Sequence, residues 1–170
     1  MLKTNLYKQV LGLLATMALS LLVLAACQQD NAVMNTAELT DFATRYADAW
    51  SGQNPAEFAS FYAENGSLRI NDDQPSIGRD AIEAKAREFM AAFPDMVVRL
   101  VELRRAGDQV EFHWHWTGTN TGAGGTGRAV DLKGYETWTF DSDGLIAESL
   151  GHLDEDQYQR QLNANLENSD

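Results

Sequence analysis

The sequence predicts an α+β domain in which helices come first and cover one face of an antiparallel sheet. Apolar residues recur at helical spacing between residues 35 and 93, whereas four later runs alternate apolar and polar residues as strands do. Tight turns follow the first and the third of these runs, and a glycine-rich loop over residues 118–127 follows the second, which favours strands that pair in chain order. Helices followed by such a meander are typical of the α+β class.

The chain begins with a segment that resembles an export signal. Lys3 and Lys8 precede an apolar run that ends in Leu24-Ala25-Ala26-Cys27. This ending resembles the lipobox, after which bacterial signal peptidase cuts and the cysteine is acylated. We therefore expect residues 1–26 to be a lipoprotein signal peptide and Cys27 to be the lipidation site. An uncleaved anchor is the alternative, because the run approaches the roughly 20 residues that a membrane span needs.

We expect residues 27–34 to be a lipidated tether and residues 35–166 to be the folded domain. Gln28 follows the cysteine in place of Asp, which indicates the periplasmic side of the outer membrane in a Gram-negative envelope. Cys27 is the only cysteine, so no disulfide is expected.

The composition is strongly acidic. The net charge is −12, and without Lys3 and Lys8 the chain has 11 basic and 25 acidic residues. This excess of negative charge disfavours nucleic acid as a partner. It would also repel anionic lipid headgroups, so we expect the lipid on Cys27 to be the membrane attachment.

Three helices are predicted, each with a recognisable end. The first begins after Asn35, with Glu38 three residues later, and stops at Gly52. In the second, Asn54 is the cap and Pro55 takes the first helical position. The third spans Asp80 to Phe93 and is ended by a proline, and a short strand from Ser67 to Ile70 lies between the second and third helices.

The remaining chain is predicted to form four strands, over residues 96–103, 110–119, 130–140 and 145–153. In the second of these, Trp114 and Trp116 share one side, which should face the helices, whereas His113 and His115 share the other. The two histidines have the spacing of a strand metal site, but no third ligand is near in sequence. We therefore predict that the protein binds no metal and no cofactor. The face that bears the two histidines is expected to be solvated or to form a subunit interface.

The turn at residues 141–144 sets which residues of the last two strands share a face. If Phe140 pairs with Ile146, then Trp138 lies opposite Glu148, Glu136 opposite Leu150, and Gly134 opposite His152. This register predicts a face that mixes apolar residues with three polar ones, Glu136, His152 and Asp154. Such a face is suited to an apolar ligand pocket with a polar group set into it. The expected ligand-binding residues are Trp114, Trp116, Trp138 and Leu150.

Several segments carry a resemblance to a known family. They are ATRYADAWSGQNPAEFASFYAENGSLRI, GRDAI, GTNTG and GYETWTFDSDGLIAESLGHLDEDQYQRQL. In this order they resemble the nuclear transport factor 2-like superfamily, and especially its SnoaL-like, polyketide cyclase-like branch. The resemblance implies a cone, in which a curved antiparallel sheet wraps over N-terminal helices around a ligand pocket, as in ketosteroid isomerase.

The resemblance also implies roles for individual residues. Tyr46 matches the oxyanion-hole tyrosine of the isomerases, and Glu136 matches their second donor, an acid kept protonated in an apolar site. Ile70 stands where those isomerases have a general-base aspartate, unless Asp72 or Asp73 reaches in. Asp154 matches a second aspartate at the end of the last strand, and a helix cap or a pocket role are both open for it.

Three functions follow from these patterns. The first is an acid–base enzyme acting as an isomerase, cyclase or hydrolase on a small, apolar, carbonyl-bearing molecule, with Glu136, His152, Tyr46 and Asp154 as candidate catalytic residues. The second is a non-catalytic binder of a small hydrophobic ligand. The third is a scaffold or accessory subunit that forms a homodimer through the face bearing His113 and His115.

Overall fold

The computed structural model describes residues 34–163. The expected signal peptide, tether and Cys27, and the last three residues of the expected domain, therefore lie outside the described residues. None of the helices in the described part is both long and apolar enough to cross a membrane.

The helices begin and end close to where their caps predict. Helix α2 spans Thr36–Ser51, and Asn35 and Glu38 form the reciprocal capping box at its start. Helix α3 spans Pro55–Ser60 and is capped by the side chain of Asn54. Helix α4 spans Arg79–Ala92 and α5 spans Glu155–Asn163. The predicted positions of the three N-terminal helices are confirmed to within a residue or two.

Six strands form one sheet in the order β2-β1-β6-β5-β4-β3. Their bounds are Tyr62–Ile70 for β1, Ser76–Ile77 for β2, Val97–Ala106 for β3, Gln109–Thr119 for β4, Ala129–Phe140 for β5 and Ile146–Leu153 for β6. The strands β3 to β6 pair antiparallel in chain order, as the turns predicted. Strand β1, by contrast, pairs parallel with β6, a contact that no local pattern indicated.

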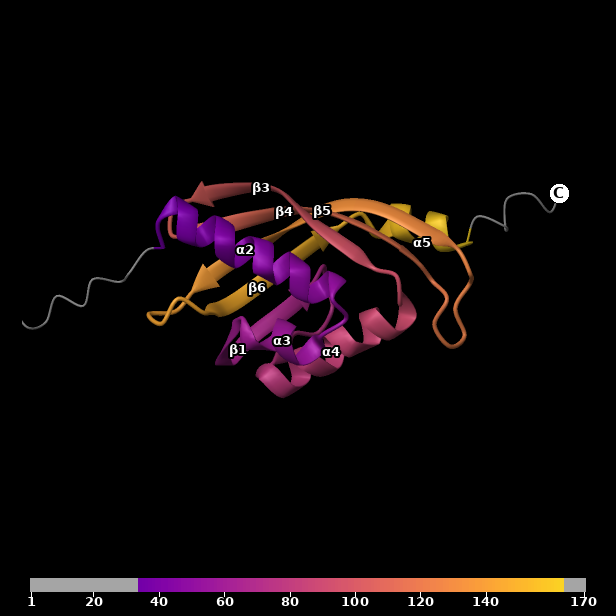
Figure 1. Cartoon of the computed structure of the whole chain (residues 1–170), viewed down its shortest axis with the longest axis horizontal. Coiled ribbons are helices and arrows are strands. Elements are labelled where there is room, and N and C mark those ends of the chain that lie inside the picture. Colours follow the sequence, from indigo (N-terminus) through magenta and orange to yellow (C-terminus); the bar gives the residue numbers. More distant parts are fainter. Residues whose placement is uncertain (1–33, 164–170) are drawn as a thin grey trace, which may run out of the picture. The chain divides into compact units, whose positions relative to one another are not determined.

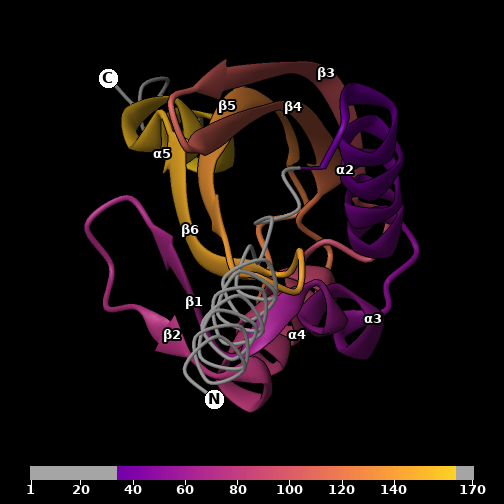
Figure 2. The same cartoon turned by 90° about the vertical axis from the view of Figure 1, so that its left-hand side faces the viewer.

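The sheet curves over an interior that the helices close. Helix α2 packs against β3, and α4 packs against β1 and β2. Figure 2 looks along the curved sheet, with α2 on one side and α3 and α4 below, and Figure 1 shows the same arrangement from the side. The predicted α+β fold with a curved sheet over N-terminal helices is therefore confirmed.

The interior is rich in aromatic side chains. Phe112 stacks on Trp138 at a ring-centroid distance of 4.7 Å, and Tyr46 packs edge-on against the same indole at 4.8 Å. Trp138, Tyr46 and Phe112 have no exposed surface. As predicted, the side of β4 that carries the tryptophans faces the helices, because Val110, Phe112, Trp114 and Trp116 are all buried.

The predicted register of β6 is wrong by one residue. Phe140 pairs with Ile146 as expected, but Thr139 then pairs with Glu148, so that Ala147 is an extra residue in β6. A bulge of this kind moves every later side chain to the opposite face of the sheet. Glu136 consequently lies opposite Gly151 and Trp138 lies opposite Ser149.

A candidate ligand cavity around a buried carboxyl

Glu136 is the centre of a buried polar network. Its Oε2 atom accepts hydrogen bonds from Tyr46 Oη at 2.7 Å, from Trp138 Nε1 at 2.9 Å and from Ser149 Oγ at 2.6 Å. Tyr46 Oη also lies 2.9 Å from Tyr62 Oη. Because the Tyr46 proton points to Glu136, Tyr62 donates in this second bond. The network joins α2, β1, β5 and β6.

Burial dominates the acid–base properties of this network. It raises the pKa of the Glu136 carboxyl above its ordinary value, and the hydrogen bonds from Ser149, Trp138 and Tyr46 oppose that shift. Burial, followed by the proximity of Glu136, raises the pKa of both Tyr46 and Tyr62 well above their ordinary value. The two tyrosines therefore stay protonated and act as hydrogen-bond donors.

The second carboxyl oxygen of Glu136 has no such partners. Oε1 makes no hydrogen bond with any described residue, although Glu136 is only 7% exposed. Glu136 lines a cavity of about 70 Å³. Oε2 is saturated by three donors, so Oε1 is the oxygen that remains for a molecule in that cavity.

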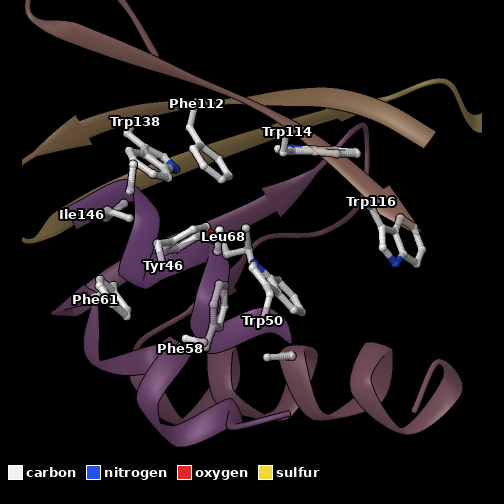
Figure 3. Close-up of a cluster of buried hydrophobic side chains, with 14 of the residues drawn as sticks. Tyr46, Trp50, Phe58, Phe61, Leu68, Phe112, Trp114, Trp116, Trp138 and Ile146 are labelled. Atoms are coloured by element: carbon white, nitrogen blue, oxygen red, sulfur yellow. The ribbon is translucent and has the colours of Figure 1, made fainter. Parts of the chain in front are cut away.

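The walls of the cavity are almost entirely apolar. Four aromatic residues from α2, α4 and β4 contribute: Trp50, Phe89, Trp114 and Trp116. Aliphatic side chains and methionine supply most of the remainder: Leu68, Ile70, Met96, Val98 and Leu153. In Figure 3, Trp50, Leu68, Trp114 and Trp116 surround one region, with Tyr46 beside Leu68 and Trp138 farther away next to Phe112. An apolar cavity with few polar groups is the usual form of a small-molecule site.

Gly134 makes room for one of these walls. A Cβ atom at this position would lie 2.4 Å from Trp114 Cζ2 and 2.3 Å from the main-chain oxygen of His152. The indole of Trp114 therefore lies across the place where a side chain would stand. The space at Gly134 is filled by the tryptophan, and Gly134 pairs with Leu153 and not with His152 as predicted.

The predicted ligand-binding residues divide into two groups. Trp114 and Trp116 line the cavity. Trp138 does not: it is fully buried in the core and contributes the hydrogen bond from its Nε1 to Glu136. Leu150 pairs with Thr137 on the other face of the sheet, because the bulge at Ala147 has turned it away from the cavity.

The same bulge separates His152 from Glu136. His152 contributes to the cavity lining, but it pairs with Tyr135, and its ring stacks on the Tyr135 ring at 4.5 Å on the outer face of the sheet. The predicted shared face of Glu136 and the His152 imidazole is therefore wrong.

Asp154 caps a helix and does not line the cavity. Its Oδ1 accepts a hydrogen bond from the Gln157 main-chain nitrogen at 2.8 Å, and its main-chain oxygen accepts one from Tyr158. The side chain is exposed at the start of α5. Of the two roles that the sequence left open, the structure places Asp154 in the capping role.

No second carboxylate replaces the missing general base. Ile70 lines the cavity with an apolar side chain, and Asp72 and Asp73 are exposed in the turn that follows β1. Among the described residues, Glu136 is the only acidic side chain in the cavity wall, and no lysine or arginine accompanies it there.

Sequence reasoning missed Ser149, Tyr62 and Trp50. Trp50 lies near the end of α2 and Tyr62 begins β1, and neither residue carries a local signal of a site. Ser149 gave no local signal, since its inward orientation depends on the bulge at Ala147. One further polar group is notable: Trp116 Nε1 is the one buried side-chain polar atom without a hydrogen-bond partner in the described part.

The remaining histidines lie outside the cavity. His113 Nε2 contacts Glu111 at 2.8 Å and His115 Nε2 contacts Asp131 at 2.7 Å, on the outer face of the sheet. Over residues 34–163, no group of three or more His, Cys, Asp or Glu side chains is arranged to hold a metal ion. The use of this face for dimer formation stays a prediction.

Comparison with known families identifies the domain. The family model for the SnoaL-like domain matches residues 43–149. The chain belongs to the SnoaL-like domain family. No curated protein matches it.

Solved structures share the SnoaL-like fold at low sequence identity. A hypothetical protein from Catenulispora acidiphila with a ketosteroid isomerase-like fold, solved in complex with trimethylamine, has a TM-score of 0.64 and 20% identity over 72% of this chain and 92% of that one. TsrD from Streptomyces laurentii has a TM-score of 0.66 and 18% identity, over 77% and 98%. A protein from Jannaschia sp. CCS1, provisionally assigned as a SnoaL-like polyketide cyclase, has a TM-score of 0.64 and 18% identity, over 74% and 91%.

Proposed function

We propose that this SnoaL-like domain binds a small, mainly apolar molecule in its cavity and that Glu136 Oε1 engages the polar group of that molecule. The observation that carries the proposal is the asymmetry of one buried carboxyl, in which Oε2 accepts three hydrogen bonds and Oε1 accepts none. A carboxyl oxygen that faces a largely apolar cavity is costly unless a ligand or water in the cavity satisfies it.

The dimensions of the cavity limit the ligand. A volume of about 70 Å³ corresponds to roughly two water molecules, at about 30 Å³ for each in the liquid. We therefore expect a compact ligand, or the compact end of a longer one that extends through the opening. The trimethylamine in the Catenulispora acidiphila structure is a small molecule of this kind.

Native mass spectrometry of the full chain, purified gently from its own membranes, tests the proposal. We expect a retained small molecule on the wild type and its loss on Glu136→Gln, which keeps the shape of the side chain. Glu148→Gln is the matched control, because Glu148 is exposed and lies outside the cavity wall. Retention of the same molecule by Glu136→Gln would show that Glu136 is not the anchor.

Acid–base chemistry on a carbonyl compound is the second candidate. The raised pKa of Glu136 favours it, since burial stabilises the protonated carboxyl, which can donate a hydrogen bond to a carbonyl oxygen and can also return a proton. In this scheme Tyr46 is a positioning residue, because its proton is directed to Glu136 and not to the cavity.

Exchange of α-hydrogens for deuterium separates catalysis from binding. Cyclopentanone is incubated with the full chain in D2O, and loss of its α-proton signal is followed by NMR. Acid–base catalysis predicts exchange above the buffer rate with the wild type and with Glu148→Gln, and the buffer rate with Glu136→Gln. Exchange at the buffer rate with the wild type and both variants would contradict acid–base catalysis and favour ligand binding as the function.

We also propose that Cys27 is acylated and anchors the domain to the bacterial envelope. The support is the Leu24-Ala25-Ala26-Cys27 sequence after an apolar run, together with an acidic chain that has little attraction to anionic lipid. Cys27→Ala should move the protein from the membrane fraction to the soluble fraction and remove the lipid mass from the intact chain. A membrane-bound Cys27→Ala protein would instead indicate an uncleaved anchor.

A further inference from the structure

The cavity combines a carboxyl oxygen with aromatic walls and contains no positive charge of its own. All three donors to Glu136 Oε2 are neutral groups, from tyrosine, tryptophan and serine. No lysine or arginine of the described chain lines the cavity. An ionised Glu136 would therefore lack a counter-cation in a largely apolar site, which is costly.

The aromatic walls supply a second feature that attracts a cation. Trp50, Trp114 and Trp116 all line the cavity, and tryptophan has the ring face that binds cations best. Trp114 has no aromatic ring of the described residues stacked on it, and its indole lies across Gly134. In Figure 3 this indole is seen edge-on above Leu68 and Trp50. Indoles gathered around one carboxylate are the arrangement that recognises alkylated ammonium groups.

The charge of the protein favours the same kind of ligand. The net charge is −12, so the field around the domain attracts small cations and repels phosphates and carboxylates. An anionic ligand would in addition meet Glu136 inside the cavity. The net charge of the protein and the Glu136 carboxyl in the cavity wall therefore both disfavour anionic ligands.

We propose that the ligand of this cavity carries a small alkylammonium group, whose charge lies near Glu136 Oε1 and whose alkyl carbons pack against Trp50, Trp114 and Trp116. This proposal rests on the proposed function, in which the cavity binds a small molecule, and adds the charge of that molecule. Glu136 is ionised in this complex, with three hydrogen bonds on Oε2 and the ammonium group on Oε1.

A matched pair of probes tests the charge. The tert-butylammonium ion and tert-butanol have nearly the same size and shape, but only the first is a cation. Each is titrated into the full chain, and the four tryptophan indole N–H signals are followed by NMR. Trp50, Trp114 and Trp116 report on the cavity wall, whereas Trp138 reports on the core.

We expect tert-butylammonium to bind the wild type at least tenfold more tightly than tert-butanol, with shifts of the three cavity indoles. Glu136→Gln should reduce that ratio to below threefold, and Glu148→Gln should leave it unchanged. Trp114→Leu, which leaves the carboxyl in place, should weaken the binding of the cation several-fold more than that of the alcohol. Thermal unfolding of each variant verifies that it is folded.

The outcomes separate this proposal from the proposed function. Equal binding of the two probes to the wild type would overturn the ammonium proposal and leave a neutral-ligand cavity. Tighter binding of the cation that persists in Glu136→Gln would also overturn it. If neither probe shifts a cavity indole at any soluble concentration, the cavity is not a small-molecule site, and the proposed function fails together with the ammonium proposal.

Discussion

Gly134→Ala is the substitution whose effect the structure defines most sharply. The new Cβ would lie 2.3 Å from the His152 main-chain oxygen and 2.4 and 2.6 Å from Trp114 Cζ2 and Cη2. The carbonyl belongs to the neighbouring strand β6, so it cannot move without disturbing the β5–β6 pairing. Overpacking of this kind costs about 2–3 kcal/mol. The usual gain of about 0.5–1 kcal/mol on replacing glycine within a strand offsets part of it.

The expected net loss is about 1–2.5 kcal/mol, or a fall of roughly 2–10 °C in melting temperature for a domain of this size. Circular dichroism measures the melting temperature, and tryptophan fluorescence reports displacement of the Trp114 indole into the cavity. Gly118→Ala, within β4, is the control, because its Cβ would meet Met96 and Phe93 at 3.4 Å. It should leave the melting temperature unchanged or slightly raised. A Gly134→Ala protein with the wild-type melting temperature and fluorescence would refute the close-packing argument.

Three further predictions concern the network and the cap. Ser149→Ala removes the 2.6 Å hydrogen bond to Glu136. We therefore expect a loss of about 1–2 kcal/mol in unfolding free energy and a further rise in the Glu136 pKa. NMR titration of the Glu136 carboxyl measures this pKa, and an unchanged value would contradict the prediction. Asp154→Ala should cost about 1 kcal/mol by loss of the α5 cap and should leave ligand affinity intact. Weaker ligand binding by this variant would show that Asp154 contributes to the binding site. Burial raises the pKa of Glu136 in the folded state above its ordinary value of 4.5. Protonation of Glu136 therefore stabilises the folded state, fully at pH values below 4.5. This stabilisation is lost as the pH rises through the folded-state pKa. The unfolding free energy of the wild type minus that of Glu136→Gln should therefore decrease over that range, and a constant difference in urea unfolding would show that the pKa is not raised.

Much of the fold follows from short-range patterns in the sequence. The capping box at Asn35 and Glu38 and the Asn54-Pro55 start each depend on residues within one helical turn, so local sequence is sufficient to place them. The alternation along β4 likewise identifies its buried side, because successive side chains of a strand point to opposite faces. The resemblance then named the family and placed Tyr46 and Glu136, which the structure brings within hydrogen-bonding distance.

Those patterns could not predict which residues of β6 face the cavity and the Glu136 network. One extra residue at Ala147 turned Leu150 and His152 to the outer face and brought Ser149 to the carboxyl. A single-residue bulge leaves no clear trace in sequence, yet it reverses the orientation of everything that follows it in the strand.

The sequence by itself determined the helix ends, the order of strands β3 to β6 and the buried side of β4, because neighbours along the chain decide these features. Only the tertiary structure decided which polar groups meet. Tyr46 and Glu136 are 90 residues apart in the chain, and their contact depends on α2 packing beneath a sheet whose last strand is bulged. The free energy of the buried carboxyl thus depends on contacts between distant segments, which are formed only when the whole domain is folded.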